Sequence, residues 1–364
     1  MNNKKKVLII AYDGMGKSGV PGVIMEIING LHDKYDFTIA VFSSIEGDYY
    51  FQRIKELGIE IIVIPKQSNT NKIGRFYREY IGYHNYLYRC FNDIFKTKQY
   101  DAVHSFKEGD SSGIFKAARK NKIDRRILHT TVLHNNNSGL VGLLQRHKLK
   151  LTNKYASQRV GVSKLSCELA FKGNEYTVIH NSYNSDIYKY KDTGPFHRLE
   201  MVQVGYFCNN KNQLFSLELC KKLQVAFPDV LLHFFGYSNE KDYYEKMLKY
   251  INEQDLSNNV IIHSYDEEQT EVFNNCSFAL TPSLREGFSI TILEAQACGI
   301  RCIASTGVPD DANAGGVEYL ELNVDLWSSL IVNEFTTNKG KHKKYDLGEY
   351  SSHNFVRNID KLYR

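Results

Sequence analysis

Two glutamates near one short apolar run are well placed to bind a polar ligand. Phe278–Thr281 has the composition of a buried strand, and Ile290–Ala297 is rich in helix-forming residues before Gly299. Glu286 therefore lies in the loop before the expected helix, whereas Glu294 lies more than one turn inside it. This spacing excludes an acid–base pair on one helix face, but the two carboxylates can bind two ends of one ligand.

The start of this helix predicts an anion site. Gly287 permits a tight turn, and Ser289 is a residue type that caps helices. Helix N-terminal N–H groups bind phosphate, and open α/β sheets bind ligands beyond the carboxyl ends of their strands. A diphosphate between two hydroxyl-bearing sugars, as in a nucleotide sugar, would suit both the amides and the carboxylates. By spacing alone, two surface glutamates on an ordinary helix are the default interpretation, because this spacing often occurs by chance.

A second candidate phosphate site lies near the start of the chain. Residues 11–18 approach the pattern G-x-x-x-x-G-K-[ST], with Ala11 in the first position and Gly16, Lys17 and Ser18 at the end. Pro21 and two glycines follow, and in a helix interior Pro costs about 3 kcal/mol and Gly about 1. We therefore expect a loop longer than a P-loop, and favour a flexible turn facing a cleft between domains.

The elements that position these residues alternate along the chain. Short Val/Ile-rich runs are separated by longer amphipathic stretches, which predicts the α/β class with parallel sheets covered on both faces. The expected strands are 6–11, 37–42, 59–65, 102–105, 126–129, 159–162 and 177–180, then 201–205, 230–236, 260–264, 278–281 and 301–304.

Length and composition favour two soluble domains. The 364 residues correspond to about two domains at roughly 150 residues each. Residues 181–200 lack periodicity and carry Gly194-Pro195, so we expect one domain over 1–195 and a second from 196. The net charge of +5 suits anionic small ligands or a weakly held acidic membrane surface, and does not demand nucleic acid.

Several other classes of protein are not supported. The apolar runs are far shorter than the roughly 20 residues of a membrane helix, and the first residues lack the apolar core of a signal peptide. The seven cysteines lie in unrelated contexts without a C-x-x-C motif, so neither a zinc site nor a disulfide framework is expected. We expect a cytoplasmic protein.

The segment from Pro282 to Gly299 closely resembles the E-x7-E region of the family-4 retaining glycosyltransferases. That resemblance implies the GT-B fold, in which two Rossmann-like, doubly wound domains face an interdomain cleft. It implies that Glu286 contacts donor-sugar hydroxyls and that Glu294 contacts the nucleotide ribose. By the same resemblance, the donor is surrounded by Gly287, Phe288 and Ser289. The second domain is expected to span 196–345, and a helix within 346–364 to return to the first domain.

Parts of the first domain resemble the same family. The turn containing Gly16 and Gly19 resembles its first glycine-rich loop, with Pro21 disturbing the usual pattern. His129, at the end of Arg126-Ile-Leu-His129, resembles a strand-end histidine at the catalytic site, and His134 is a close rival. We favour His129.

The start of the second domain also resembles the family. Gly205-Tyr206 through Lys211 corresponds to its phosphate-binding segment, in which Lys211 fits. Tyr206 stands where Arg is expected, so a forked contact to the diphosphate would be lost. Arg285 could compensate for that loss.

The resemblance implies a metal-independent hexosyltransferase that needs no cofactor and retains anomeric configuration. We expect it to move a sugar from a nucleoside diphosphate sugar, with UDP-sugar favoured, to an acceptor hydroxyl. Lys211 and the helix amides would stabilise the leaving diphosphate, while His129 would orient the donor. The expected acceptor is a sugar or a lipid-linked oligosaccharide, in assembly of a capsule, another polysaccharide or a glycolipid at the inner face of the cell membrane.

Residues 69–94 are rich in Tyr and Arg. They form either a solvated helix or a surface that binds the acceptor or lipid headgroups.

Three other functions stay open. They are a catalytically weak nucleotide-sugar-binding partner subunit, a GT-B sugar-nucleotide epimerase, and a P-loop nucleoside triphosphatase.

Overall fold

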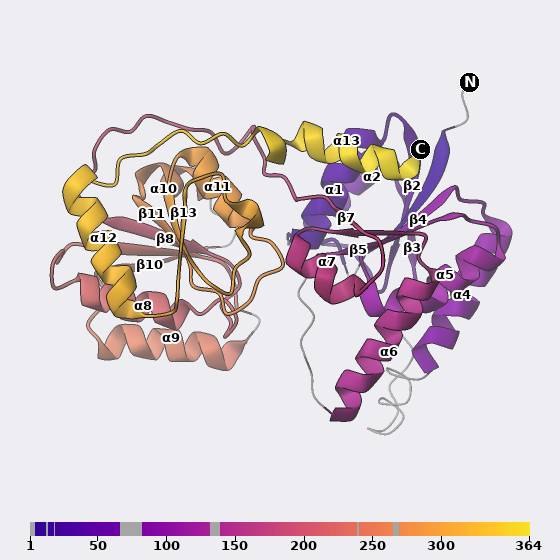
Figure 1. Ribbon diagram of the computed structural model, residues 1–364, viewed down its shortest axis with the longest axis horizontal. Helices are drawn as coiled ribbons and strands as arrows, with labels where there is room; N and C mark the ends of the chain where they lie inside the picture. The colour runs from indigo at the N-terminus through magenta and orange to yellow at the C-terminus, as the bar shows by residue number, and fades with distance from the viewer. Residues whose placement is uncertain are drawn as a thin grey trace. The chain divides into compact units, whose positions relative to one another are not determined.

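The computed structural model describes residues 4–11, 14–17, 19–65, 82–131, 139–238, 240–264 and 269–364. It divides into two compact units, one of residues 1–181 with 353–364 and the other of residues 182–352 (Figure 1). Each unit is built on a parallel sheet with helices packed against it, as the α/β alternation predicts.

The units divide earlier in the sequence than we expected. We placed the boundary at residue 195, whereas the second unit begins at Ser182. Residues after Ser182 are held by that unit: Tyr188 packs against Phe273 with ring centroids 5.7 Å apart, and the Phe196 amide donates to the Lys339 carbonyl at 3.0 Å. Segment 182–195 is therefore part of the second unit.

In the first unit, the described residues form a seven-stranded parallel sheet in the order β3-β2-β1-β4-β5-β6-β7. All seven predicted strands are found, with small shifts at their ends. The strands are β1 Lys5–Ile10, β2 Tyr35–Val41, β3 Glu60–Val63, β4 Ala102–Ser105, β5 Arg125–Thr130, β6 Gln158–Gly161 and β7 Thr177–Val178. The helices are α1 Gly19–Leu31, α2 Phe51–Glu56, α4 Tyr83–Thr97, α5 Ser111–Lys120, α6 Gly139–Tyr155, α7 Lys164–Phe171 and α13 Ser352–Tyr363.

The sheet of the first unit is buried on both faces because alternate strand residues point to opposite sides. Val7 and Ile9 pack with α1 and α13, whereas Leu8 and Ile10 pack with α4, α5 and α7. Helix α13 completes the first of these cores (Figure 1). The final helix therefore belongs to the first unit.

Two expectations about the first unit need correction. Helix α1 already begins at Gly19 and continues through Pro21 and Gly22, so the loop is not extended there. Pro21 falls in the first helical turn, where its missing N–H would have no intrahelical partner anyway. Part of the stretch 69–94, expected to be a solvated helix or a surface, is core: Leu87 and Phe91 of α4 are buried. The aromatic residues of 69–81, which are Phe76, Tyr77 and Tyr80, lie outside the described residues.

In the second unit, the described residues form a six-stranded parallel sheet in the order β10-β9-β8-β11-β12-β13. Five strands were predicted and β13 was missed. The strands are β8 Glu200–Val204, β9 Leu231–Phe235, β10 Val260–His263, β11 Phe278–Thr281, β12 Arg301–Ser305 and β13 Val317–Leu320. The helices are α8 Gln213–Leu223, α9 Lys241–Glu253, α10 Gln269–Asn275, α11 Ile290–Cys298 and α12 Val324–Asn338.

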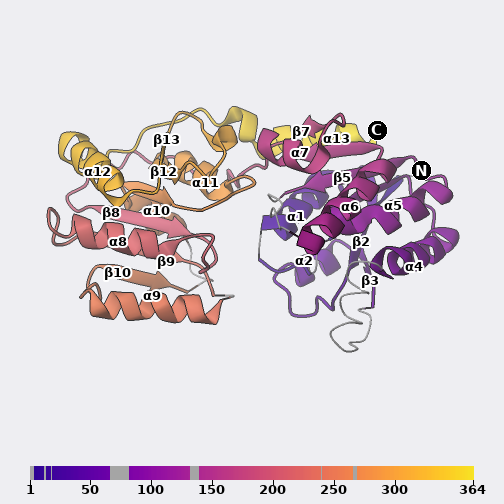
Figure 2. The same cartoon turned by 60° about the horizontal axis from the view of Figure 1, so that its bottom comes forward.

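Helices cover both faces of the second sheet. Helices α10 and α11 lie on one side and α8 and α9 on the other, where α8 and α9 run side by side (Figures 1 and 2). The core beneath α8, α9 and α12 includes Trp327, which is fully buried and is the one tryptophan of the chain.

The order of the second sheet fixes the position of a ligand site. Numbered within the unit, it is the doubly wound order 3-2-1-4-5-6. In such sheets the direction of winding reverses between the first and fourth strands, and ligands bind beyond their carboxyl ends. Here these are the neighbouring strands β8 and β11.

Candidate functional site

An ion pair lies just beyond the carboxyl ends of β8 and β11. Lys211, in the loop after β8, places its Nζ 2.5 Å from Oε1 of Glu286, in the loop after β11. The Ser283 hydroxyl donates to the same carboxylate oxygen at 2.8 Å. Two residues singled out in the sequence, 75 positions apart, are therefore direct neighbours.

The two loops are also joined through the backbone. The Leu284 amide donates to the Asn210 carbonyl at 2.8 Å, and the Asn210 side chain donates to the Arg285 carbonyl at 2.9 Å. The Gln203 amide group, buried at the end of β8, donates to the Lys211 carbonyl at 2.7 Å. These bonds hold Lys211 and Glu286 in place without using either charged group.

A third loop, after β12, packs against the Glu286 loop. The Glu286 amide donates to the Gly307 carbonyl at 3.1 Å, and the buried Ser305 hydroxyl donates to the Ser283 carbonyl. A Cβ at Gly307 would lie only 2.1 Å from the Leu284 carbonyl oxygen. Sequence reasoning missed Gly307, because its need for a small side chain arises from a partner 23 residues away that only the fold reveals.

This arrangement can bind a ligand that carries both negative charge and hydroxyl groups. An ammonium has three N–H donors, so Lys211 keeps donors beyond the one used by Glu286. Carboxylate oxygens, such as those of Glu286, accept hydrogen bonds from hydroxyls. The Glu286 side chain is 11% exposed and the Lys211 side chain 23% exposed. Such a half-buried pair interacts more strongly with a ligand than an exposed pair does.

Helix α11 begins beside this pair but is not capped as expected. Ser289 occupies the N-cap position with extended backbone, yet its side chain makes no capping hydrogen bond. The sequence prediction of a Ser289 cap is therefore wrong, because residue type alone does not set the side-chain rotamer. Gly287 and Phe288 precede it and are buried, and Gly299 ends the helix in the left-handed conformation with φ 94°.

Glu294 lies on α11, one residue after the buried Leu293. Its side chain is partly buried, and loss of hydration raises its pKa to about 7, although a hydrogen bond from the Tyr188 hydroxyl favours the ionised form. A carboxyl with this pKa changes charge near neutral pH. Tyr188, in the segment we had taken for a linker, was missed.

Tyr206 stands beside another tyrosine rather than alone. The Tyr237 hydroxyl, beyond β9, donates to the Tyr206 hydroxyl at 2.9 Å, and the rings meet edge to face at 4.6 Å. Burial is the main cause of a raised pKa at Tyr237, so the Tyr237 hydroxyl keeps its proton at ordinary pH and can donate it. This end of the sheet therefore offers two tyrosine hydroxyls where an arginine was expected. The partly buried Arg285 lies in the loop after the neighbouring strand β11.

The remaining predicted residues belong to the first unit. His129 is fully buried near the end of β5, and its Nε2 has no hydrogen-bond partner among the described residues. Gly16 and Gly19 precede and begin α1, and a Cβ at either would meet no atom within 4 Å. His134 and Ser18 lie outside the described residues.

The loop before α1 has contacts that the P-loop pattern did not predict. Lys17 Nζ lies 5.5 Å from the centre of the Tyr49 ring, a cation–π contact. The Asp48 carboxylate accepts from the Met15 amide at 2.6 Å, and a Cβ at Gly14 would lie 2.7 Å from that carboxylate. An acidic side chain thus occupies the Met15 amide, in a loop whose amides a phosphate would need.

Sequence reasoning also missed two charged residues that follow β4, at the winding reversal of the first sheet. Glu108 is buried and accepts from the Thr130 hydroxyl, next to His129. Lys107 is buried too, with its Nζ 4.4 Å from the centre of the Phe42 ring. Their position directly after an apolar strand, opposite β1, is a sequence feature that could have identified them.

Among the described residues one group could hold a metal ion, formed by Glu200, His233 and Cys276. Two of its three side chains are already paired: His233 bonds Glu200 at 3.1 Å and His263 at 2.9 Å, and Arg198 donates to the same Glu200 carboxylate. Burial raises the pKa of the Cys276 thiol, which disfavours a thiolate. The group lies near the start of β8, at the opposite end of this strand from the loop that carries Lys211.

No helix in the described part of the chain has the length and apolar character needed to cross a bilayer.

The chain is similar to known proteins over most of its length. Residues 195–312, which include Lys211, Glu286 and Glu294, match the family described as Glycosyl transferases group 1. The comparisons indicate a glycosyltransferase. EpsF of Bacillus subtilis (strain 168), named as a glycosyltransferase, is 22% identical over 94% of this chain and 91% of its own length.

Two further relatives are informative. The N,N'-diacetylbacillosaminyl-diphospho-undecaprenol alpha-1,3-N-acetylgalactosaminyltransferase of Campylobacter jejuni subsp. jejuni serotype O:2 is 25% identical over 77% of this chain and 76% of its own. The crystal structure of HepE from Anabaena, in complex with UDP, superimposes with a TM-score of 0.76 at 13% identity, covering 98% of both chains. The fold is therefore GT-B.

Proposed function

We propose that the protein is a retaining glycosyltransferase that moves a sugar from a UDP-sugar to an acceptor hydroxyl. The observation that carries this proposal is the Lys211–Glu286 pair at the winding reversal of the second sheet. Both kinds of contact that a nucleotide sugar needs, a cation for diphosphate and a carboxylate for hydroxyls, meet there. The UDP held by HepE, whose fold is shared, supports UDP as the nucleotide.

The chemical demand in such a transfer is to stabilise the departing diphosphate. Lys211 would supply charge and N–H donors, and the uncapped amides at the start of α11 would supply the positive end of a helix dipole. Glu286 would hold donor-sugar hydroxyls, and Glu294 the ribose hydroxyls. No side chain of this set needs a metal to act, so we expect turnover in the presence of a chelator.

We propose a lipid-linked sugar as acceptor, in polysaccharide or glycolipid assembly at a membrane face. The Campylobacter relative is named for transfer to a diphospho-undecaprenol sugar, which supports this choice. Helix α6 adds support, because Leu140 and Leu143 near its start are 63% and 59% exposed and Lys150 follows on the same face. Apolar and basic side chains on one helix face suit an anionic lipid surface.

The test is a panel of UDP-, GDP- and ADP-sugars, with ATP plus Mg²⁺ as a control. Binding is measured by calorimetry, and slow donor hydrolysis by nucleotide release, for the wild type, Lys211→Met and Glu286→Gln. We expect one UDP-sugar to bind and be hydrolysed by the wild type, with release reduced at least about tenfold in both variants. Absence of binding by every nucleotide sugar, or a response to ATP alone, would refute the proposal.

Retention is tested separately. With the donor identified, the anomeric proton of the product is followed by NMR, and an α-linked donor should give an α-linked product. A β-linked product would refute the retaining assignment while leaving the transfer itself intact. The comparisons favour none of the three alternatives: binding-only partner, epimerase or nucleoside triphosphatase.

A further inference from the structure

Three buried side chains of the first unit form a hydrogen-bonded row. The Tyr363 hydroxyl, on α13, lies 2.6 Å from His104 Nδ1, and His104 Nε2 lies 3.1 Å from His129 Nδ1. Both histidines are fully buried, and Tyr363 is 1% exposed. The Phe106 ring stacks on both imidazoles, at 4.7 Å and 4.8 Å, so neither ring can turn freely.

Both histidines in the row are neutral. Burial lowers the pKa of His129 to about 3, and burial together with the neighbouring His129 lowers the pKa of His104 well below its usual value. A neutral imidazole carries one N–H and one bare nitrogen. Each contact of the row needs one hydrogen, so only two arrangements of protons fit.

In the first arrangement, Tyr363 donates to His104 Nδ1, and His104 Nε2–H donates to His129 Nδ1. His129 then carries its proton on Nε2. In the second, every proton is reversed: His129 Nδ1–H donates to His104, whose Nδ1–H donates to the tyrosine oxygen. The Tyr363 proton would then need another acceptor, and the hydroxyl has none among the described residues.

The first arrangement leaves one polar group unpaired, the Nε2–H of His129, whereas the second leaves two, the Tyr363 proton and the His129 Nε2 lone pair. Each unpaired buried group is costly. We propose that Tyr363 is a positioning residue that, through His104, holds His129 as the Nε2–H tautomer and so makes it a hydrogen-bond donor.

The proposal defines what His129 can do. A bare Nε2 could take a proton from an acceptor hydroxyl, but a protonated Nε2 can only donate to an oxygen. Its role as a site residue rests on the proposed function: there, His129 would donate to a sugar hydroxyl or phosphate oxygen and would not act as the general base. The tautomer itself follows from the row alone.

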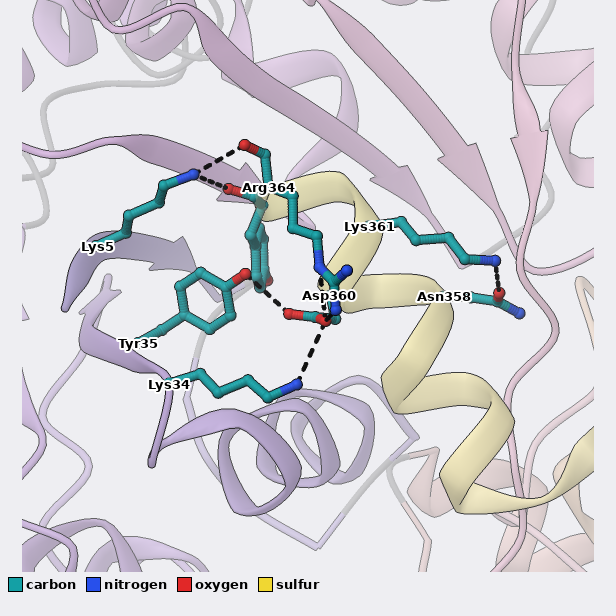
Figure 3. Close-up of polar contacts among 8 residues, drawn as sticks. Lys5, Lys34, Tyr35, Asn358, Asp360, Lys361 and Arg364 are labelled. Atoms are coloured by element: carbon teal, nitrogen blue, oxygen red, sulfur yellow. Dashed lines mark hydrogen bonds and ion pairs between the residues drawn. The ribbon is translucent and has the colours of Figure 1, made fainter. Parts of the chain in front are cut away.

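The anchor of α13 does not depend on the Tyr363 hydroxyl. The Asp360 carboxylate accepts from the Tyr35 hydroxyl at 2.8 Å, from Lys34 at 3.4 Å and from Arg364, and Lys5 donates to the Arg364 carbonyl at 2.8 Å (Figure 3). Removing the hydroxyl of Tyr363 should therefore leave the helix docked. Removing that of Tyr35 perturbs the docking without touching His104, which makes it a matched control.

The experiment reads the tautomer directly. Protein with ¹⁵N-labelled histidine is studied by long-range ¹H–¹⁵N correlation NMR, in which protonated and bare ring nitrogens have well-separated shifts. The His129 signals are assigned with His129→Gln. We expect an excess of the Nε2–H form of about tenfold or more in the wild type and in Tyr35→Phe, and a rise of the Nδ1–H form to about a third or more in Tyr363→Phe.

A wild-type His129 with its proton on Nδ1, or populations unchanged in Tyr363→Phe, would overturn the proposal. Should Tyr363→Phe fail to fold, as judged by circular dichroism, the wild-type tautomer alone decides. Transferase assays separate the two levels. If the expected tautomers are found in a protein that binds no nucleotide sugar, the role of Tyr363 is supported and the proposed function is refuted. If the protein transfers sugar but His129 has the opposite tautomer, the proposed function stands and the role of Tyr363 is refuted.

Discussion

Glu294→Gln should stabilise the second unit by an amount that grows as the pH rises from 4.5 to 7 and is constant above that. Burial raises the pKa of Glu294 from 4.5 to about 7, so the folded unit binds this proton more tightly than the unfolded chain does. Stability from this group is therefore full below pH 4.5, falls as the pH rises to 7, and is lost above it. Gln resembles the protonated form at every pH and can still accept from Tyr188.

The size of the effect follows from the pKa. At 1.36 kcal/mol per unit, the shift corresponds to about 3 kcal/mol, and the partial exposure of the side chain reduces this to about 2–3 kcal/mol. We expect Glu294→Gln to raise the free energy of unfolding by that amount at pH 8.5 and by less than about 0.5 kcal/mol at pH 4.5.

Trp327 provides the assay. It is the one tryptophan of the chain and is buried in the core of the second unit. Tryptophan fluorescence therefore follows the unfolding of the second unit in urea, without a tryptophan signal from the first unit. Other titrating groups are common to both proteins and cancel in the difference. An equal gain at both pH values, or none at pH 8.5, would show that Glu294 titrates normally and would refute the reasoning.

Further outcomes follow from the same site. Lys211→Met keeps the aliphatic chain but removes a charge-assisted bond, so UDP affinity measured by calorimetry should fall about 10–100-fold; an unchanged affinity would remove Lys211 from the site. Gly307→Ala should lower the free energy of unfolding, measured by calorimetry, by about 1–3 kcal/mol, because its Cβ meets the Leu284 carbonyl. Gly16→Ala is the control: its Cβ meets open space, so the same free energy should change by less than about 0.5 kcal/mol. Tyr206→Arg should raise UDP affinity about tenfold, and a weaker complex would contradict an open diphosphate position beside Tyr206.

Strands buried on both faces were predictable from sequence because each is a continuous apolar run. Val7–Ile10 is fully buried and was found without difficulty. β13 was missed because Val317–Leu320 lies at the sheet edge, where three of its four side chains are partly exposed and Glu318 interrupts the run. Proline is tolerated in the first turn of a helix but not in its interior. The sequence did not show that α1 begins at Gly19, so Pro21 was taken for an interior residue.

The candidate site was predictable as a set of residue types but not as a geometry. Glu286, Lys211 and Glu294 were identified from motifs, yet the 2.5 Å contact between the first two depends on how β8 and β11 pair. Partners supplied by distant segments, such as Tyr188 for Glu294 and Tyr363 for His104, have no local pattern. His104 itself looks like an ordinary strand residue until the fold places it beside His129.

The return of the chain to the first unit has a consequence for synthesis. Phe355 and Ile359 of α13 belong to the same core as Val7 and α1, but the ribosome makes them only after the whole second unit. At 5–20 residues per second, the 171 residues of 182–352 delay them by roughly 10–30 s. During that interval the second unit can fold completely while the first exposes the apolar groove that α13 later fills, so the part of the chain made first is the last to be finished.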